Sequence, residues 1–518
     1  MGTRIGARLL ALGALAACVA AAAGCGSRST AAGGGGASPP GGGGSPPGDG
    51  GSPPGGGVVA AAPCASTGAA AAPGGRITFG TAGPWNAGNC AYDASTIRES
   101  WVVDVATDEA ENRWIATPTA LYLATPGGAL RRYDERDGLH LGEATGLAPG
   151  PVGWVKYCDG VPLAGDAPCS GAVIWGGATQ YGIFSLAGGG PNEVFVGYHG
   201  GKTPGLTCGA DPDPDWCDPL VHSGKIDRVR LNADGSLTVD RFDYWENDVG
   251  RGYWHNRSPF RLLYDHVAHP GTLYSANDHG VDIAFPDRFT PYAAPQGLDA
   301  WQDTWFGDHA HAVVCTPVPC GQPGSQTRAG DWRGLALDAQ GRLWHAGEWT
   351  AGLIRWNADP VSWWVHGAFD AAFGDPYTPG AGFRNEPVFK VPQEGDPVHL
   401  TAVSVCPDGR VWFASSGATS VSDTVAVWDG SAFQTFDARA LGLSEQGVQD
   451  LVCLPDGRIV LAGVTAGAAV YDPAHGSSRP LAGIPGAHVN RLGVDAMVSP
   501  FALLVSTDAG AAVLRNVE

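Results

Sequence analysis

Residues 401–414 read TAVSVCPDGRVWFA, and residues 449–462 read QDLVCLPDGRIVLA. Each stretch begins with alternating apolar residues, turns at Asp-Gly and continues with a second apolar run. Alternation with a period of two around an Asp-Gly turn predicts a β-hairpin. Cys406 and Cys453, one in each copy, are 47 residues apart, a spacing typical of structural repeats built from short strands.

Further copies of this phrase lie on either side. Residues 334–344 read GLALDAQGRLW, and a weaker copy joins residues 103–108 to residues 113–116. Third strands are expected at 353–356, 425–428 and 469–471. Degenerate copies are expected at 262–266 with 272–275 and 281–283, at 492–494 with 503–505 and 512–514, at 172–175 with 182–185, and at 193–196 with 226–230.

These copies add up to about seven units, with eight as the alternative, and helical periodicity is nearly absent. We therefore predict an all-β fold, a β-propeller over residues 100–518, in which radial repetition leaves only short strand edges. Another all-β repeat or a sandwich is the competing architecture. Trp114, Trp344 and Trp412 recur at one position of the repeat, as residues that pack between blades would.

The phrase "strand, Asp-x-Gly-x-hydrophobic-Trp, strand" resembles the propeller repeats of two-component regulators, which occur in ligand-sensing ectodomains. The resemblance covers roughly residues 100–517 and implies the fold more strongly than a function. No kinase or response-regulator segment follows in this sequence, so the signalling role of that family is not carried over.

The N-terminus has the features of an export signal. Arg4 and Arg8 precede a short apolar run at residues 9–19, and small residues lead to Cys25. This run is too short to span a membrane and suits a signal peptide over residues 1–24. Ala22-Ala23-Gly24-Cys25 resembles the lipobox of bacterial lipoproteins, which implies that Cys25 is lipidated, and Gly26 favours the outer membrane by the same resemblance. An ordinary secretory signal is the alternative.

Residues 25–63 would form a disordered tether rich in Gly, Pro and Ser, because such a composition cannot bury a core. A lead-in strand and loop are expected at 64–99. The formal charge of −20 argues against nucleic acid, whose phosphates require Lys and Arg. We expect a monomer in the cell envelope, attached to the membrane through the lipid on Cys25 and facing either the periplasm or the exterior.

The cysteines support export to an oxidising compartment. Of the 12 cysteines, ten remain after Cys18 is removed with the signal and Cys25 is lipidated, and they fall as near neighbours. The expected pairs are Cys64 with Cys90, Cys158 with Cys169, Cys208 with Cys217, Cys315 with Cys320, and Cys406 with Cys453. For the last pair, two buried thiols remain the alternative to a disulfide.

Histidines concentrate where the repeat is most degraded, between residues 243 and 311. Departure from a structural repeat often marks a functional site. The candidate ligand or metal residues are Asp265, His266, Asn277, Asp278, His279, Asp308, His309 and His311. A transition metal is one interpretation of these residues, and hydrogen-bonded blade and loop residues are the other.

A second, weaker candidate is an acidic loop that would suit Ca²⁺, which prefers several oxygen ligands. Its residues are Asp211, Asp213, Asp215 and Asp218. A solvated acidic loop is the simpler interpretation. No cofactor is indicated beyond a divalent metal at one of these two places.

Two functions remain open from the sequence. The first is a non-enzymatic binding or scaffold module for an envelope or extracellular protein, peptide or glycan. The second is an exported propeller enzyme, such as a metal-dependent hydrolase, lactonase or lyase with a site lined by His and Asp. The sequence contains no HExxH, GxSxG or GxxxxGK[ST] motif, which favours the binding module.

Overall fold

The hairpin predicted at residues 401–414 forms the first two strands of a four-stranded antiparallel sheet in the computed structural model of the chain. These strands are β24 (Leu400–Val405) and β25 (Val411–Ser415), and β26 (Val425–Trp428) and β27 (Phe433–Phe436) follow. Cys406 and Arg410 close the turn between the first two strands through a backbone hydrogen bond of 2.8 Å. Gly409 has a φ of 85°, a conformation that glycine adopts without steric cost.

The described residues are 62–63, 90–93, 96–97, 99, 101–126, 130–139, 141, 154–158, 161–162, 173–177, 182–199, 224–242, 259–277, 281–287, 306–310, 314–316, 326–328, 332–347, 351–355, 368–369, 400–416, 423–463, 465, 467–496, 501–515 and 517. The chain divides into two units, residues 1–51 and 52–518, and every described residue lies in the second.

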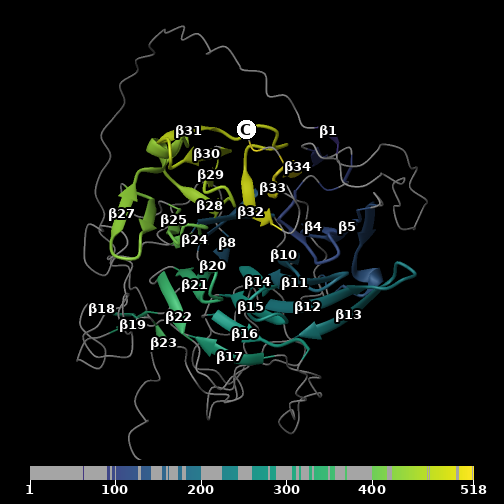
Figure 1. Cartoon of the computed structure of the whole chain (residues 1–518). Helices are drawn as coiled ribbons and strands as arrows, with labels where there is room; N and C mark the ends of the chain where they lie inside the picture. The colour runs from purple at the N-terminus through teal and green to yellow at the C-terminus, as the bar shows by residue number, and fades with distance from the viewer. Residues whose placement is uncertain are drawn as a thin grey trace, which may run out of the picture. The chain divides into compact units, whose positions relative to one another are not determined.

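Six further sheets repeat this pattern, and most of their strands are labelled in Figure 1. The first four have the strands β3 (Asp104–Thr107), β4 (Arg113–Thr117), β5 (Ala120–Ala124) and β6 (Leu130–Tyr133); β10 (Gly182–Gly188), β11 (Glu193–His199), β12 (Gly224–Leu231) and β13 (Leu237–Phe242); β14 (Arg261–Asp265), β15 (Thr272–Ala276), β16 (Val281–Ala284) and β17 (Phe306–Ala310); and β20 (Trp332–Leu337), β21 (Leu343–Gly347), β22 (Ala351–Arg355) and β23 (Ala368–Phe369). The last two have β28 (Val448–Cys453), β29 (Ile459–Gly463), β30 (Ala468–Asp472) and β31 (Ser477–Pro480); and β32 (Val489–Asp495), β33 (Ala502–Thr507) and β34 (Gly510–Leu514).

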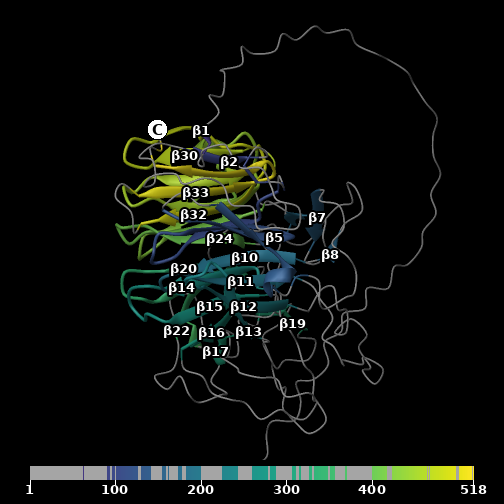
Figure 2. The ribbon, with the colours of Figure 1, turned by 90° about the vertical axis from the view of Figure 1, so that its right-hand side faces the viewer.

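The last sheet is completed from the N-terminal side. β2 (Cys90–Asp93) pairs antiparallel with β34, and β1 (Ala62–Pro63) pairs with β2. The lead-in strand is therefore the fourth strand of the C-terminal sheet, which joins both ends of the propeller sequence in one blade. Figure 2 shows β2 in the same sheet as β33.

The seven sheets form a closed ring. The first strand of each sheet contacts the first strand of the next, in the order β3, β10, β14, β20, β24, β28 and β32, and β32 contacts β3. Radial sheets joined through their innermost strands define a seven-bladed β-propeller. This architecture confirms the all-β propeller predicted from the sequence, and its blade count is the lower of the two predicted.

Two small sheets lie outside this pattern. One joins β7 (Trp154–Cys158), β8 (Val161–Pro162) and β9 (Val173–Gly177), and the other joins β18 (Val314–Thr316) and β19 (Gln326–Arg328). The sequence analysis combined residues 172–175 with residues 182–185 in one unit, which was wrong. β9 belongs to the first small sheet, whereas β10 is the inner strand of a separate blade.

The repeated tryptophans lie in the core, as predicted. Trp114 is fully buried, Trp344 is 5% exposed and Trp412 is 1% exposed. The indole nitrogen of Trp114 donates to Asp108 Oδ2 at 2.9 Å, and that of Trp344 donates to Asp338 Oδ2 at 3.1 Å. In both blades the aspartate stands six residues before the tryptophan and also accepts backbone N–H groups of the turn.

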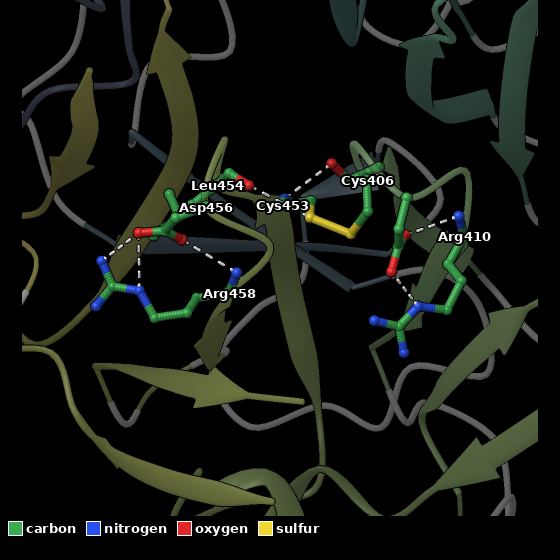
Figure 3. The surroundings of a disulfide bond; sticks show 8 residues. Cys406, Arg410, Cys453, Leu454, Asp456 and Arg458 are labelled. Atoms are coloured by element: carbon green, nitrogen blue, oxygen red, sulfur yellow. Dashed lines mark hydrogen bonds and ion pairs between the residues drawn. A yellow bond between two sulfur atoms is a disulfide. The ribbon is translucent and has the colours of Figure 1, made fainter. Parts of the chain in front are cut away.

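Cys406 stands where these two blades have aspartate, six residues before Trp412. Cys406, directly after β24, and Cys453, the last residue of β28, form a disulfide between neighbouring blades, with a Cα–Cα distance of 5.3 Å (Figure 3). The sequence analysis had left open whether this pair was bridged. At this position the other two blades have an aspartate that forms hydrogen bonds within its own turn and to the tryptophan. Here the cysteine instead forms a covalent bond to the neighbouring blade.

Helical structure is limited to short 3₁₀ segments among the described residues, at Glu135–Asp137 (η1) and Ala438–Leu441 (η4). In the described part of the chain, no helix has the length and apolar character needed to cross a membrane.

Candidate functional site

Asp265 and His266, two of the residues singled out from the sequence, lie in the turn between β14 and β15. The Asp265 carboxylate is buried and accepts the backbone N–H groups of Val267, Ala268 and His269 at 2.8–2.9 Å. This carboxylate therefore fixes the turn. His266 Nδ1 lies 3.1 Å from Glu109 Oε1, in the corresponding turn of the first blade.

Asn277 lies at the opposite end of the same blade. Its side-chain amide donates to Asp282 Oδ2 at 2.6 Å, and both residues are buried. Asp265 pairs with Thr272 while Arg261, four residues earlier, pairs with Ala276. Four residues of strand span roughly 13 Å, so the structure does not bring Asp265 and Asn277 into one site.

The remaining candidates of this region are only partly described. Asp308 and His309 lie on β17, the outermost strand of their blade, where they pair with Ile283 and Asp282. β17 lies at the outer edge of the blade, whereas β14 lines the ring centre. Asp278, His279 and His311 lie outside the described residues. The described residues contain no group of three or more His, Cys, Asp or Glu side chains arranged to hold a metal ion.

Several other predicted sites also fall outside the described residues. These are Cys25, the acidic loop at Asp211, Asp213, Asp215 and Asp218, and the cysteines Cys64, Cys169, Cys208, Cys217 and Cys320. Cys158 and Cys315 are described only as strand residues. Cys90 is disulfide-bonded.

The ring centre holds a layer of residues that the sequence analysis did not single out. The register aligns one inner-strand residue of each blade with a small residue of the second strand. The inner-strand residues are Asp104, Ser185, Arg261, Gly334, Ala402, Asp450 and Arg491, and their partners are Ala116, Gly197, Ala276, Ala346, Ala414, Ala462 and Ser506. We call the end of the ring where the inner strands begin the entry face, and the end where they turn back the turn face. This layer lies near the entry face.

The polar members of this layer bind neighbouring blades. Asp104 Oδ2 accepts the N–H of Leu186 at 2.8 Å, and Asp450 Oδ2 accepts the N–H of Leu492 at 2.9 Å. Ser185 Oγ donates to the carbonyl of Pro259 at 2.6 Å. These bonds join the starts of adjacent inner strands, so they hold the layer in a fixed geometry.

Two arginines reach across the ring centre rather than to an adjacent blade. Arg261 Nη2 on β14 lies 2.6 Å from Asp450 Oδ1 on β28, although β20 and β24 separate these strands in the ring. Arg491 on β32 donates to the carbonyl of Phe260, which directly precedes β14. The ring is therefore braced across its centre by two arginine side chains.

A third arginine joins them around Phe260. The Arg333 guanidinium carbon lies 4.2 Å from the centroid of the Phe260 ring, a cation–π contact. Arg261 Nε donates to the carbonyl of Arg333 at 3.1 Å. We call Arg261, Arg333 and Arg491 the arginine cluster. Arg333 is 3% exposed, whereas the Arg261 side chain is 15% exposed and Arg491 is half-buried.

The electrostatics of the arginine cluster show an excess of positive charge. Burial and the repulsion of Arg261 lower the pKa of Arg491 to about 10, and Arg333 adds to this repulsion. Burial raises the pKa of Asp104 despite the attraction of Arg491. A guanidinium whose pKa falls in this way would gain from a further negative charge nearby.

A sequence signal for the arginine cluster did exist. Each arginine directly precedes or begins the alternating apolar run of its inner strand, at Arg261-Leu262, Arg333-Gly334 and Arg491-Leu492. The apolar residues that define the repeat come after each arginine, so the arginines lie outside the repeated pattern. Only the ring closure reveals that these strand starts meet at one centre.

Comparison with known proteins identifies no family. No family model matches the chain, and no curated protein matches it. Among solved structures, YCF48 bound to D1 peptide is similar over 85% of this chain and 96% of that chain, with 11% identity and a TM-score of 0.39. The WD40 β-propeller domain of Doa1 is similar over 80% of this chain and 92% of that chain, with 13% identity and a TM-score of 0.39. The propeller assignment itself rests on the sheet topology of the chain.

Proposed function

We propose that this protein is an envelope-anchored lipoprotein whose propeller binds a protein or peptide partner at its entry face. The anchor is the lipid on Cys25, and residues 26–61, which precede β1, tether the propeller to the outer membrane. Two or more acyl chains give stable attachment where one chain is marginal. The binding role rests on the arginine cluster at the ring centre.

The composition of this cluster carries the proposal. Arginine and aromatic residues dominate binding hot spots, because they combine large contact areas with directional hydrogen bonds. Arg261 and Arg491 are partly exposed at the entry face, and Phe260, which directly precedes Arg261, is 1% exposed. Cationic groups concentrated in a chain with a formal charge of −20 would select an anionic group on the partner.

The frame around the cluster supports the same role. The hydrogen bonds between inner strands and the disulfide between Cys406 and Cys453 hold the arginines in place before a partner arrives. A site that is already ordered loses little conformational entropy on binding, so more of the contact energy appears as affinity.

A random-peptide display library tests this function. The full chain, purified in detergent, is compared with the variant Arg333→Gln/Arg491→Gln and with the control Arg342→Gln/Arg410→Gln. Both control arginines lie at the turn face, where each forms an ion pair with an aspartate. Circular dichroism verifies the folding of all three proteins.

We expect a recurring peptide motif on the wild type and the control, and its loss on the entry-face variant. Absence of any motif on the wild type, or recovery of the same motif on the entry-face variant, would contradict the proposed function.

A further inference from the structure

We propose that the group bound by the arginine cluster is a carboxylate presented by a peptide. This inference rests on the proposed function and specifies the chemistry that the entry face recognises. Its basis is the way in which Arg491, Arg261 and the two central aspartates already use their hydrogen-bonding groups.

Arg491 is the arginine best placed to receive the carboxylate. A guanidinium has five N–H donors in a planar fork. Among the described residues, Arg491 donates to the carbonyl oxygen of Phe260, a neutral acceptor. Hydrogen bonds from a guanidinium to a carboxylate are about twice as strong as neutral ones, and the fork matches the two oxygens of a carboxylate. A hydrogen bond from Arg491 to an incoming carboxylate would therefore be stronger than its hydrogen bond to the Phe260 carbonyl.

The carboxylates already at the ring centre are occupied. Asp104 accepts the N–H groups of Val105 and Leu186 through its two oxygens. Asp450 accepts the N–H groups of Leu451 and Leu492 and also binds Arg261. Because these oxygens hold the inner strands together, neither aspartate can turn toward Arg491 without loss of bonds between or within the blades.

The charge count selects a single negative charge. Arg491 interacts electrostatically with the other two arginines of the cluster and with two aspartates, so these five described groups together carry one net positive charge. One carboxylate neutralises this excess. A phosphate dianion would carry more charge than the excess and would be repelled by Asp104 and Asp450. The chemistry at the ring centre therefore favours a carboxylate over a phosphate group.

The carboxylate has two sources in a peptide, the C-terminus and the side chains of Asp or Glu. Equilibrium dialysis with mass-spectrometric readout separates them. The probes are N-acetylated random tetrapeptide pools in three matched forms: a free C-terminus without acidic side chains, the same pool with a C-terminal amide, and the amide pool with one internal Glu. The protein is the full chain in detergent, as wild type, Arg491→Gln, Arg491→Lys and the turn-face control Arg342→Gln.

We expect the wild type to retain at least one of the two carboxylate pools about tenfold better than the neutral amide pool, the difference expected for a charge-assisted hydrogen bond pair. Preference for the free C-terminus over the Glu pool assigns a terminal carboxylate, preference for the Glu pool assigns a side-chain carboxylate, and equal retention of both assigns a carboxylate from either source. Arg491→Gln should lose the preference, Arg491→Lys should keep only part of it, and Arg342→Gln should match the wild type.

Equal retention of the neutral and carboxylate pools by the wild type overturns the carboxylate assignment, whatever the variants do. If the display selection still yields a motif that depends on the arginines, the proposed function stands and only this inference fails. If neither experiment shows peptide binding, both fail.

Discussion

Removal of the Asp450 carboxylate should destabilise the propeller by about 3–5 kcal/mol, the cost of breaking a buried ion pair from one side. Asp450 is fully buried, and its oxygens accept from Arg261 at 2.6 Å, from Leu451 at 3.0 Å and from Leu492 at 2.9 Å. In Asp450→Ala, Arg261 loses its counter-charge and two backbone N–H groups lose their acceptor. Equilibrium urea unfolding, followed by tryptophan fluorescence, measures the loss.

Two comparisons isolate the cause. Asp408→Ala removes another ion pair, with Arg410 at 2.6 Å, but the Asp408 side chain is 46% exposed, so it should cost no more than about 1 kcal/mol. Arg261→Met in the Asp450→Ala background should recover part of the loss, about 1 kcal/mol or more, because it removes the uncompensated charge. If Asp450→Ala costs no more than Asp408→Ala, the central ion pair does not brace the ring.

Three further outcomes follow from the structure and the sequence. Cys406→Ser/Cys453→Ser should lower the free energy of unfolding, measured by urea unfolding without reductant, by roughly 4 kcal/mol, the loop-closure value for a separation of 47 residues. Burial lowers the pKa of His345 to about 3, so the fold excludes its charged form. Stability should fall below pH 6.5, where the unfolded histidine takes up a proton, by about 1.4 kcal/mol per pH unit down to the folded pKa, and His345→Gln should remove this slope in urea titrations at several pH values. Cys25→Ala should abolish metabolic labelling with a fatty acid and release the protein from membranes; a variant that remains labelled and bound would contradict the lipoprotein assignment.

The sequence predicted the blade pattern well because the pattern is local. The alternation at residues 401–414 and the Asp-Gly turn are properties of neighbouring residues, and these residues form the predicted hairpin. The burial of the tryptophans was predictable for the same local reason, because Trp114, Trp344 and Trp412 hold one position of the hairpin and each is buried. The lead-in strand at 90–93 was expected, but its pairing with β34 joins residues more than 400 positions apart and has no local signal.

The candidate site was harder to predict because it depends on ring closure. Arg261 and Asp450 are 189 residues apart, and nothing in their own segments indicates that they meet. The histidine-rich region attracted attention through its composition, yet the Asp265 carboxylate is used by the turn that follows it. An Asp or Asn next to a turn commonly binds backbone N–H groups of that turn, so its presence alone does not indicate a ligand site.

Hydrogen–deuterium exchange of the full chain, with and without a peptide recovered from the display selection, tests the central claim most directly. If the partner binds at the entry face, exchange should slow in segments 259–262, 332–335 and 489–492, which carry the arginine cluster, and stay unchanged at the turn-face segments 406–410 and 454–458. Protection confined to the turn-face segments, with the arginine segments unaffected, would contradict the account.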